Sequence, residues 1–119
     1  QNCFLSSCLL MIFMKEMIFL YTKGVFFMTI ILSQYVEVEN DRLPHRIEKK
    51  IESSIIPNIG MSIEDSVWKD PYDYKVIEVL INYVEDYCYV TLEKYSEIIK
   101  NNFKNKFASM VKLHGWNYK

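Results

Sequence analysis

The sequence predicts a small α+β domain, in which a C-terminal amphipathic helix packs on a twisted, mostly antiparallel sheet of four or five strands. Apolar and polar residues alternate over much of residues 28–92, which are also rich in β-branched and aromatic side chains. A helical apolar stripe becomes clear only after residue 96. The chain has 119 residues, which is room for one hydrophobic core. We therefore expect a single domain over residues 28–119.

Residues 1–27 are expected to lie outside this domain. Lys15 and Glu16 interrupt their apolar stretch, and the runs that remain are shorter than the ~20 residues of a membrane span. No basic residue precedes the apolar core, as a secretory signal would require. Residues 23–25 need purine-rich codons that resemble a bacterial ribosome-binding site. We interpret the segment as a non-native extension upstream of a true start at Met28, which implies no membrane contact; an apolar, membrane-associated segment is the alternative.

The first predicted hairpin follows Met28, where apolar and polar residues alternate at the period of a half-buried strand. Residues 40–44 then have the composition of a turn. Residues 46–56 are predicted to return as the second strand, because this turn would pair them with the first. A helix is the alternative for this segment, since its isoleucines are four residues apart. The apolar residues of the first strand are Ile30, Leu32, Val36 and Val38.

A corner between sheet segments is predicted at Pro57 and Gly60. The proline cannot donate a hydrogen bond to a sheet, and the glycine can take the φ > 0 geometry of a tight turn. A short strand with Met61 and Ile63 is expected next, followed by a polar loop that holds Trp68.

Residues 74–92 are predicted to form two more strands, joined near residues 84–86, because β-branched and aromatic residues are enriched there. A helix through residue 89 is the alternative, since an Asp-Pro step precedes the segment and some apolar residues recur at helical spacing. Apolar residues on both sides of residues 75–81 predict a central strand that is covered on two faces.

The C-terminal segment is predicted to form an amphipathic helix that packs across the sheet. Ser96 is the expected N-cap, and Gly115 supplies the left-handed position at which helices end. Lysines in the middle and last turns favour the negative end of the helix dipole. The predicted apolar stripe consists of Ile99, Phe103, Phe107, Met110 and Val111.

Part of this pattern resembles small uncharacterised bacterial and phage-associated proteins. The resemblance rests on Pro57-Asn58-Ile59-Gly60, Ile63, Tyr74-Lys75-Val76, Val79 and Val90-Thr91-Leu92. In those proteins a long hairpin leads into PxxG, and a YxVxxV strand precedes a final VxL strand. The resemblance covers about the middle third of the chain. It implies a curved β-meander or a partly open SH3-like barrel and a prophage or mobile-element origin, and it implies no activity.

The residues that nucleophilic catalysis would need are far apart in the sequence. His45 follows a turn proline and His114 ends the predicted helix, so both are interpreted as surface or capping residues. Cys88 lies in an alternating strand and is interpreted as a buried, inert thiol. The three cysteines form no disulfide framework, which favours a reducing compartment, the cytoplasm. We therefore expect no enzymatic activity.

No cofactor or metal is expected either. Four carboxylates lie in or beside the central loop, but their spacing lacks the ligand series and the central glycine of an EF-hand. The three glycines are isolated, so the chain has no phosphate-cradling loop. The carboxylates, interpreted as a solvated polar loop, are Glu64, Asp65, Asp70 and Asp73.

Charge is unevenly distributed along the chain, although the formal net charge is only −1. Residues 28–92 contain six basic and twelve acidic residues, a net charge of −6. Residues 93–119 contain six basic and two acidic residues, a net charge of +4. The basic tail either complements the acidic remainder of the domain or meets an anionic partner.

The function predicted from these observations is a non-enzymatic protein-interaction module that binds a protein partner or associates with itself. The alternative is RNA or single-stranded nucleic-acid binding through the basic C-terminal helix, in which lysines would neutralise phosphates and aromatic rings would stack on bases. The candidate binding residues are Trp68, Tyr72, Lys100, Lys104, Lys106, Lys112 and Trp116.

Overall fold

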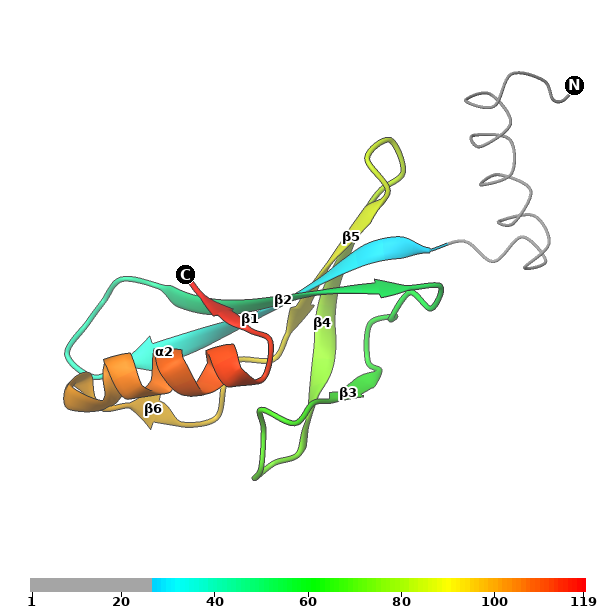
Figure 1. Cartoon of the computed structure of the whole chain (residues 1–119). Coiled ribbons are helices and arrows are strands. Elements are labelled where there is room, and N and C mark those ends of the chain that lie inside the picture. Colours follow the sequence, from blue (N-terminus) through cyan, green and yellow to red (C-terminus); the bar gives the residue numbers. More distant parts are fainter. Residues whose placement is uncertain (1–26) are drawn as a thin grey trace, which may run out of the picture.

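Strands dominate the part of the chain that the computed structural model describes, residues 27–119, and one short α-helix follows near the C-terminus (Figure 1). The predicted α+β class is confirmed. The interpretation of the preceding segment as a non-native extension lies outside the described residues, apart from Phe27. The elements are β1 (Met28–Val38), β2 (His45–Ser53), β3 (Ser62–Glu64), β4 (Asp73–Asn82), β5 (Tyr87–Leu92), β6 (Ile98–Ile99), the 3₁₀ turn η1 (Asn101–Phe103), α2 (Lys104–Leu113) and β7 (Asn117–Tyr118).

The strands form one open, mixed sheet in the order β3-β4-β5-β1-β2-β7, with β6 paired to the far end of β1. Four pairings are antiparallel, but β5 and β6 both run parallel to β1. β1 to β5 alternate in direction along the chain when the short β3 is included, so β5 has the direction of β1 and pairs with it in parallel. The sheet is thus mostly antiparallel as predicted, while a simple meander or an SH3-like barrel is not confirmed.

The first hairpin agrees with the strand prediction and not with the helical alternative for residues 46–56. β2 pairs with β1 along its whole length, from Val36 opposite His45 to Met28 opposite Ser53. Ile47 is fully buried, whereas Ile55 is 72% exposed, so the regularly spaced isoleucines do not share one buried stripe. Their four-residue spacing therefore does not mark a helix.

The predicted corner and third strand are also present. Gly60 has φ of 91°, and its amide donates to the carbonyl of Val76 at 2.9 Å. The Val76 amide in turn donates to the carbonyl of Met61 at 2.8 Å, directly before β3. The corner thus joins the outer edge of β4 at its N-terminal end.

β4 and β5 form the predicted pair of strands, but the expected burial of β4 on two faces is wrong. Val76 is buried, whereas Ile77 and Leu80 are 54% and 59% exposed. A register shift between Val76 and Glu78 inserts one extra residue into β4. This bulge moves the inward-facing positions from Val76 to Val79, so the apolar run reflects a change of register instead of coverage on both faces.

The α-helix starts at Lys104, later than the N-cap predicted at Ser96. Ser96 instead exchanges two hydrogen bonds with the Tyr74 hydroxyl, at 3.0 and 3.1 Å. Ile99 is buried, and its carbonyl accepts from the Glu39 amide at 2.8 Å, which holds β6 against β1. This extended pairing satisfies the backbone of residues 98–99 and therefore delays the helix.

The buried core lies between one face of the sheet and a cover made by α2 and the loop of residues 65–72. Phe107 and Val111 are the buried residues of α2, as the predicted stripe requires, while Phe103 is 47% exposed. Gly115 has φ of 87° and ends the helix as predicted. In Figure 1, α2 lies along β1 and β2, and the tip of the β4–β5 hairpin projects away from it. The other core residues are Met28, Ile30, Leu32, Val36, Val38, Ile47, Val67, Trp68, Tyr74, Val76, Cys88, Val90, Leu92, Ile99 and Trp116.

Candidate interaction surfaces

Both tryptophans proposed as binding residues are in the core. Trp68 and Trp116 are 2% and 0% exposed, and their ring centroids are 5.6 Å apart. The indole nitrogen of Trp68 donates to Gln34 Oε1 at 2.9 Å, and Gln34 Nε2 donates to the Glu93 carbonyl at 3.0 Å. These indoles therefore pack the loop and the C-terminus onto the sheet, which corrects their assignment to an exposed surface.

The lysines of the predicted basic surface are spread around α2. A helix turns by about 100° per residue, so Lys106 lies on nearly the opposite side from Lys104, and Lys112 lies between them on the solvent side. Lys106 points toward η1, where its Nζ lies 5.7 Å from the centroid of the Phe103 ring. Lys100 precedes η1 in extended backbone. The structure therefore brings these ammonium groups into no single cluster.

Tyr72 is the one predicted aromatic contact residue that is strongly exposed, at 68%. It lies in the loop before β4, beside a shallow depression that Glu64, Ser66 and Lys69 also line. This depression is open to solvent, and the basic residues of α2 do not line it.

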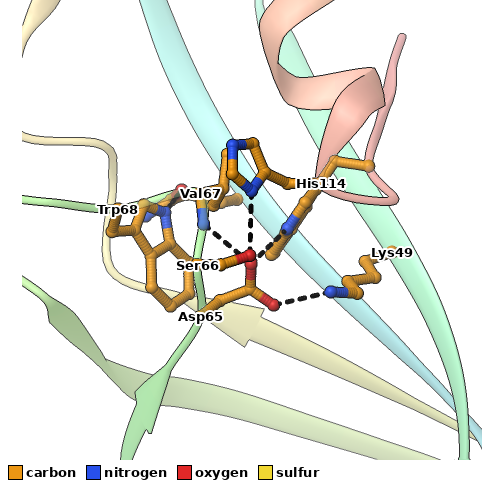
Figure 2. Close-up of polar contacts among 8 residues, drawn as sticks. Lys49, Asp65, Ser66, Val67, Trp68 and His114 are labelled. Carbon is orange, nitrogen blue, oxygen red and sulfur yellow. Dashed lines mark hydrogen bonds and ion pairs between the residues drawn. The ribbon is translucent and has the colours of Figure 1, made fainter.

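Asp65 joins this loop to the sheet and to the C-terminus (Figure 2). Its Oδ1 accepts from the Val67 amide at 3.0 Å and from Trp116 Nε1 at 3.1 Å, while Oδ2 is 2.8 Å from Lys49 Nζ. Burial acts to raise the pKa of Asp65, but the hydrogen bonds from Lys49, Trp116 and Val67 outweigh it and hold the pKa below its usual value. The sequence-based interpretation of Asp65 as part of a solvated loop is therefore wrong, since its side chain is only 10% exposed.

Ser66 and His114 form a hydrogen-bonded pair that sequence reasoning missed, because 48 positions separate them. Ser66 Oγ and His114 Nδ1 are 2.8 Å apart, in the exposed region beside Asp65 (Figure 2). The Asp65 carboxylate, however, points to Lys49 and Trp116 and not to the imidazole. In this geometry Asp65 therefore does not orient the His114 imidazole, as the carboxylate of a catalytic triad would.

His45 is likewise held in a local network at the start of β2. Its Nε2 lies 2.7 Å from Asp41 Oδ2, and its Nδ1 lies 2.8 Å from the Tyr118 hydroxyl. The hydrogen bond from the Leu43 amide and the contact with His45 lower the pKa of Asp41. The network ties β7 and the turn before β2 together, and it gives His45 a structural role.

The sheet face opposite the core carries a polar and aromatic cluster. The Tyr89 hydroxyl donates to Glu48 Oε2, and Arg46 Nη2 lies 3.1 Å from the same oxygen. Burial, followed by the hydrogen bond to Glu48, raises the pKa of Tyr89, so this phenol stays protonated at neutral pH. Burial also raises the pKa of the Cys88 thiol on the core face, which disfavours the thiolate.

The outer edge of β4 beyond Val76 is an exposed apolar segment of the sheet. Residues 77–84 contain one charged residue, Glu78. Tyr83 and Val84, at the hairpin tip, are 72% and 92% exposed. Among residues 27–119, β3 and the corner before it cover only the N-terminal part of this edge, through Val76. The bulge that exposes this segment has no simple sequence pattern, so the exposure could not be predicted. The low charge of the segment can be read from the sequence.

A second apolar surface lies between β6 and α2. It is a groove of about 410 Å³ that Ile98 and Phe103 line from its two sides, and Lys100 and Lys106 flank it. Ile98 is 62% exposed. β5, the neighbour of β4, pairs with residues 29–33 of β1, whereas β6 pairs with residues 37–38. The groove and the outer edge of β4 thus lie toward opposite ends of β1, so they can be tested separately.

Comparison of the chain with models of protein families, with curated proteins and with solved structures found no match. Within residues 27–119, no three His, Cys, Asp or Glu side chains gather in a geometry that would hold a metal ion. In the same part of the chain, no helix has the length and apolar character needed to cross a membrane.

Proposed function

We propose that the protein is a non-enzymatic interaction module that binds a protein partner along the outer edge of β4 and the start of the turn that follows it, residues 77–83. The observation that carries this proposal is the exposed, nearly uncharged edge strand with Leu80 at its centre. A partner strand would add to the sheet there through main-chain hydrogen bonds, and alternate side chains would supply selectivity.

The edge departs from the way proteins usually protect such strands. Natural edges carry lysines, prolines or bulges that discourage pairing with another chain. β4 has a bulge, but it lies at residue 77, at the beginning of the exposed part, and the next six residues contain neither proline nor a basic side chain. An edge left open in this way supports a role in pairing.

Nucleic-acid binding has less support. The lysines of α2 are dispersed, and Trp116, the candidate aromatic residue that follows this helix, is fully buried. On the open sheet face, Arg46 and Lys119 both lie beside the Glu48 carboxylate, which offsets their positive charge. A cytoplasmic location and a prophage or mobile-element origin stay predictions. The free, buried thiol of Cys88 is consistent with a reducing compartment such as the cytoplasm.

The proposal predicts that a charge at the centre of the edge abolishes partner binding. A tagged full chain is used to capture proteins from extracts of the source cell, and each retained protein is then purified and titrated against the chain. Leu80→Lys is expected to weaken binding at least about tenfold, because it places an ammonium group inside the new strand pair. The fold should be preserved, since Leu80 is 59% exposed.

Ile98→Lys is the matched control, because Ile98 is 62% exposed and lies in the groove beside α2. Binding that persists in this variant and disappears in Leu80→Lys supports the proposal. Binding that disappears only in Ile98→Lys would assign the function to the groove and overturn the proposal.

A further inference from the structure

We infer that the partner of the β4 edge is a second copy of this chain, paired antiparallel about a twofold axis at Leu80. This inference rests on the proposed function, since it uses the same edge. It follows from the exposed length of the edge, from the side chains that each possible register would oppose, and from the apolar residues at its two ends.

The length of the exposed edge limits the pairing. The hydrogen bonds between Val76 and the corner before β3 occupy the edge on one side, and the hairpin turn begins after Asn82 on the other. In the part of the chain that the structure describes, residues 77–82 of β4 remain unpaired on this edge, and Tyr83 follows them at the start of the turn. An isologous contact places the same segment of both copies side by side.

The side chains select the register. In a twofold antiparallel pair centred on Leu80, Val79 lies opposite Ile81 of the second copy, and Glu78 lies opposite Asn82. Centring on Glu78 would oppose two carboxylates, and centring on Val79 would oppose Glu78 and Leu80. Of these three registers, only the one centred on Leu80 places a hydrogen-bond donor, Asn82, opposite the Glu78 carboxylate.

Asn82 is oriented for this role. Its Oδ1 accepts from the amides of Val84 and Glu85 at 3.0 and 2.9 Å, which fixes the carboxamide at the hairpin turn. The Nδ2 group is then the part of the side chain left to donate to Glu78 of the second copy. Glu78 and Asn82 face the same side of the sheet, because they pair with Thr91 and Tyr87 on β5.

The ends of the pairing would bury two further apolar groups. In this register the hairpin tip of each copy, with Tyr83 and Val84, meets the corner before β3 of the other copy. Ile59 and Met61 are 64% and 51% exposed at that corner. The contact would still be smaller than the ~1,600 Å² of a standard interface, so we expect a weak, reversible dimer.

Disulfide trapping of the full chain tests the register. In a background with Cys3→Ser and Cys8→Ser, Leu80→Cys is expected to form a dimer under mild oxidation, because directly opposed residues are about 4.5–5.5 Å apart between Cα atoms. Ile77→Cys alone and Tyr83→Cys alone should each form no disulfide-linked dimer, since each cysteine lies about 20 Å from the same cysteine in the second copy. A mixture of the two variants should form a disulfide-linked heterodimer between Ile77→Cys and Tyr83→Cys.

Sedimentation velocity of the full chain supplies the second readout. The wild-type chain should shift from monomer to dimer as its concentration rises, and Leu80→Lys should stay monomeric while Ile98→Lys dimerises as the wild type does. Equal trapping of all three cysteine variants, or a wild-type monomer up to about 1 mM, would overturn the inference. If the chain is monomeric but Leu80→Lys still abolishes capture of another protein, the proposed function stands without the dimer. If the wild type neither dimerises nor captures any protein, both fall.

Discussion

Replacing Asp65 with alanine is expected to lower the free energy of unfolding by about 3–5 kcal/mol, because it removes the charge partner of a mostly buried lysine. The change leaves Lys49 Nζ, Trp116 Nε1 and the Val67 amide without their common acceptor. Each buried donor left unpaired adds to the cost. Urea denaturation at pH 7, followed by tryptophan fluorescence, measures the difference.

Two variants separate this effect from a general sensitivity of the loop. Asp65→Asn retains one acceptor oxygen but turns an amide group toward Lys49, so it should cost less than alanine. Glu64→Ala removes the neighbouring exposed carboxylate and should change the stability by at most about 0.5 kcal/mol. Similar losses for Glu64→Ala and Asp65→Ala would contradict the role assigned to Asp65.

The same carboxylate predicts an acid-sensitive component of stability. The pKa of Asp65 is lowered in the folded state from its ordinary value of 3.8. Its contribution is therefore complete above pH 3.8 and is lost as the pH falls through the lower, folded-state pKa. Asp65→Asn should remove this component, so the stability difference between wild type and variant should shrink below pH 4. A constant difference down to pH 2 would contradict this linkage.

Replacing Trp116 with alanine is expected to cost about 3–5 kcal/mol, since it empties the space of a fully buried indole. The ring lies against Trp68 and holds the segment after α2 on the sheet. Trp116→Phe should retain most of the packing and lose the hydrogen bond to Asp65, at a cost of about 1–2 kcal/mol. Thermal unfolding followed by circular dichroism compares the two.

Tyr72→Ala is the matched aromatic control, because Tyr72 is 68% exposed. We expect a change within about 0.5 kcal/mol for this variant. If Trp116→Ala were as mild as Tyr72→Ala, Trp116 would not be the core residue described here. If Trp116→Ala does not fold, the losses of unfolding free energy in Trp116→Phe and Tyr72→Ala are compared instead. A loss in Trp116→Phe no larger than that in Tyr72→Ala would contradict the core position of Trp116.

Local signals predicted the strands well. Period-two alternation identified β1, and the pairing of a turn with a returning segment identified β2, even though isoleucine spacing allowed a helix. Gly60 and Gly115 occupy left-handed positions as their sequence context indicated. These features depend on neighbours in the sequence, and so they can be deduced from it.

Features that depend on distant pairings could not be predicted. The hydrogen bond between Ile99 and Glu39 extends the strand region and moves the helix start, and it joins residues 60 positions apart. The bulge in β4 changes which residues face the core, and only the register with β5 defines it. The burial of Trp68 and Trp116 has no local signal, because Gln34 and Asp65, the acceptors of their indole hydrogen bonds, are remote in the sequence.

Hydrogen exchange of the full chain tests the central claim most directly. Exchange is measured for dilute protein alone and again with the partner retained in the capture experiment, or at high concentration if that partner is a second copy. We predict that binding slows the amides of residues 77–83 and leaves those of residues 98–106 unchanged. Slower exchange at residues 98–106, with no change along β4, would contradict an interaction through the strand edge.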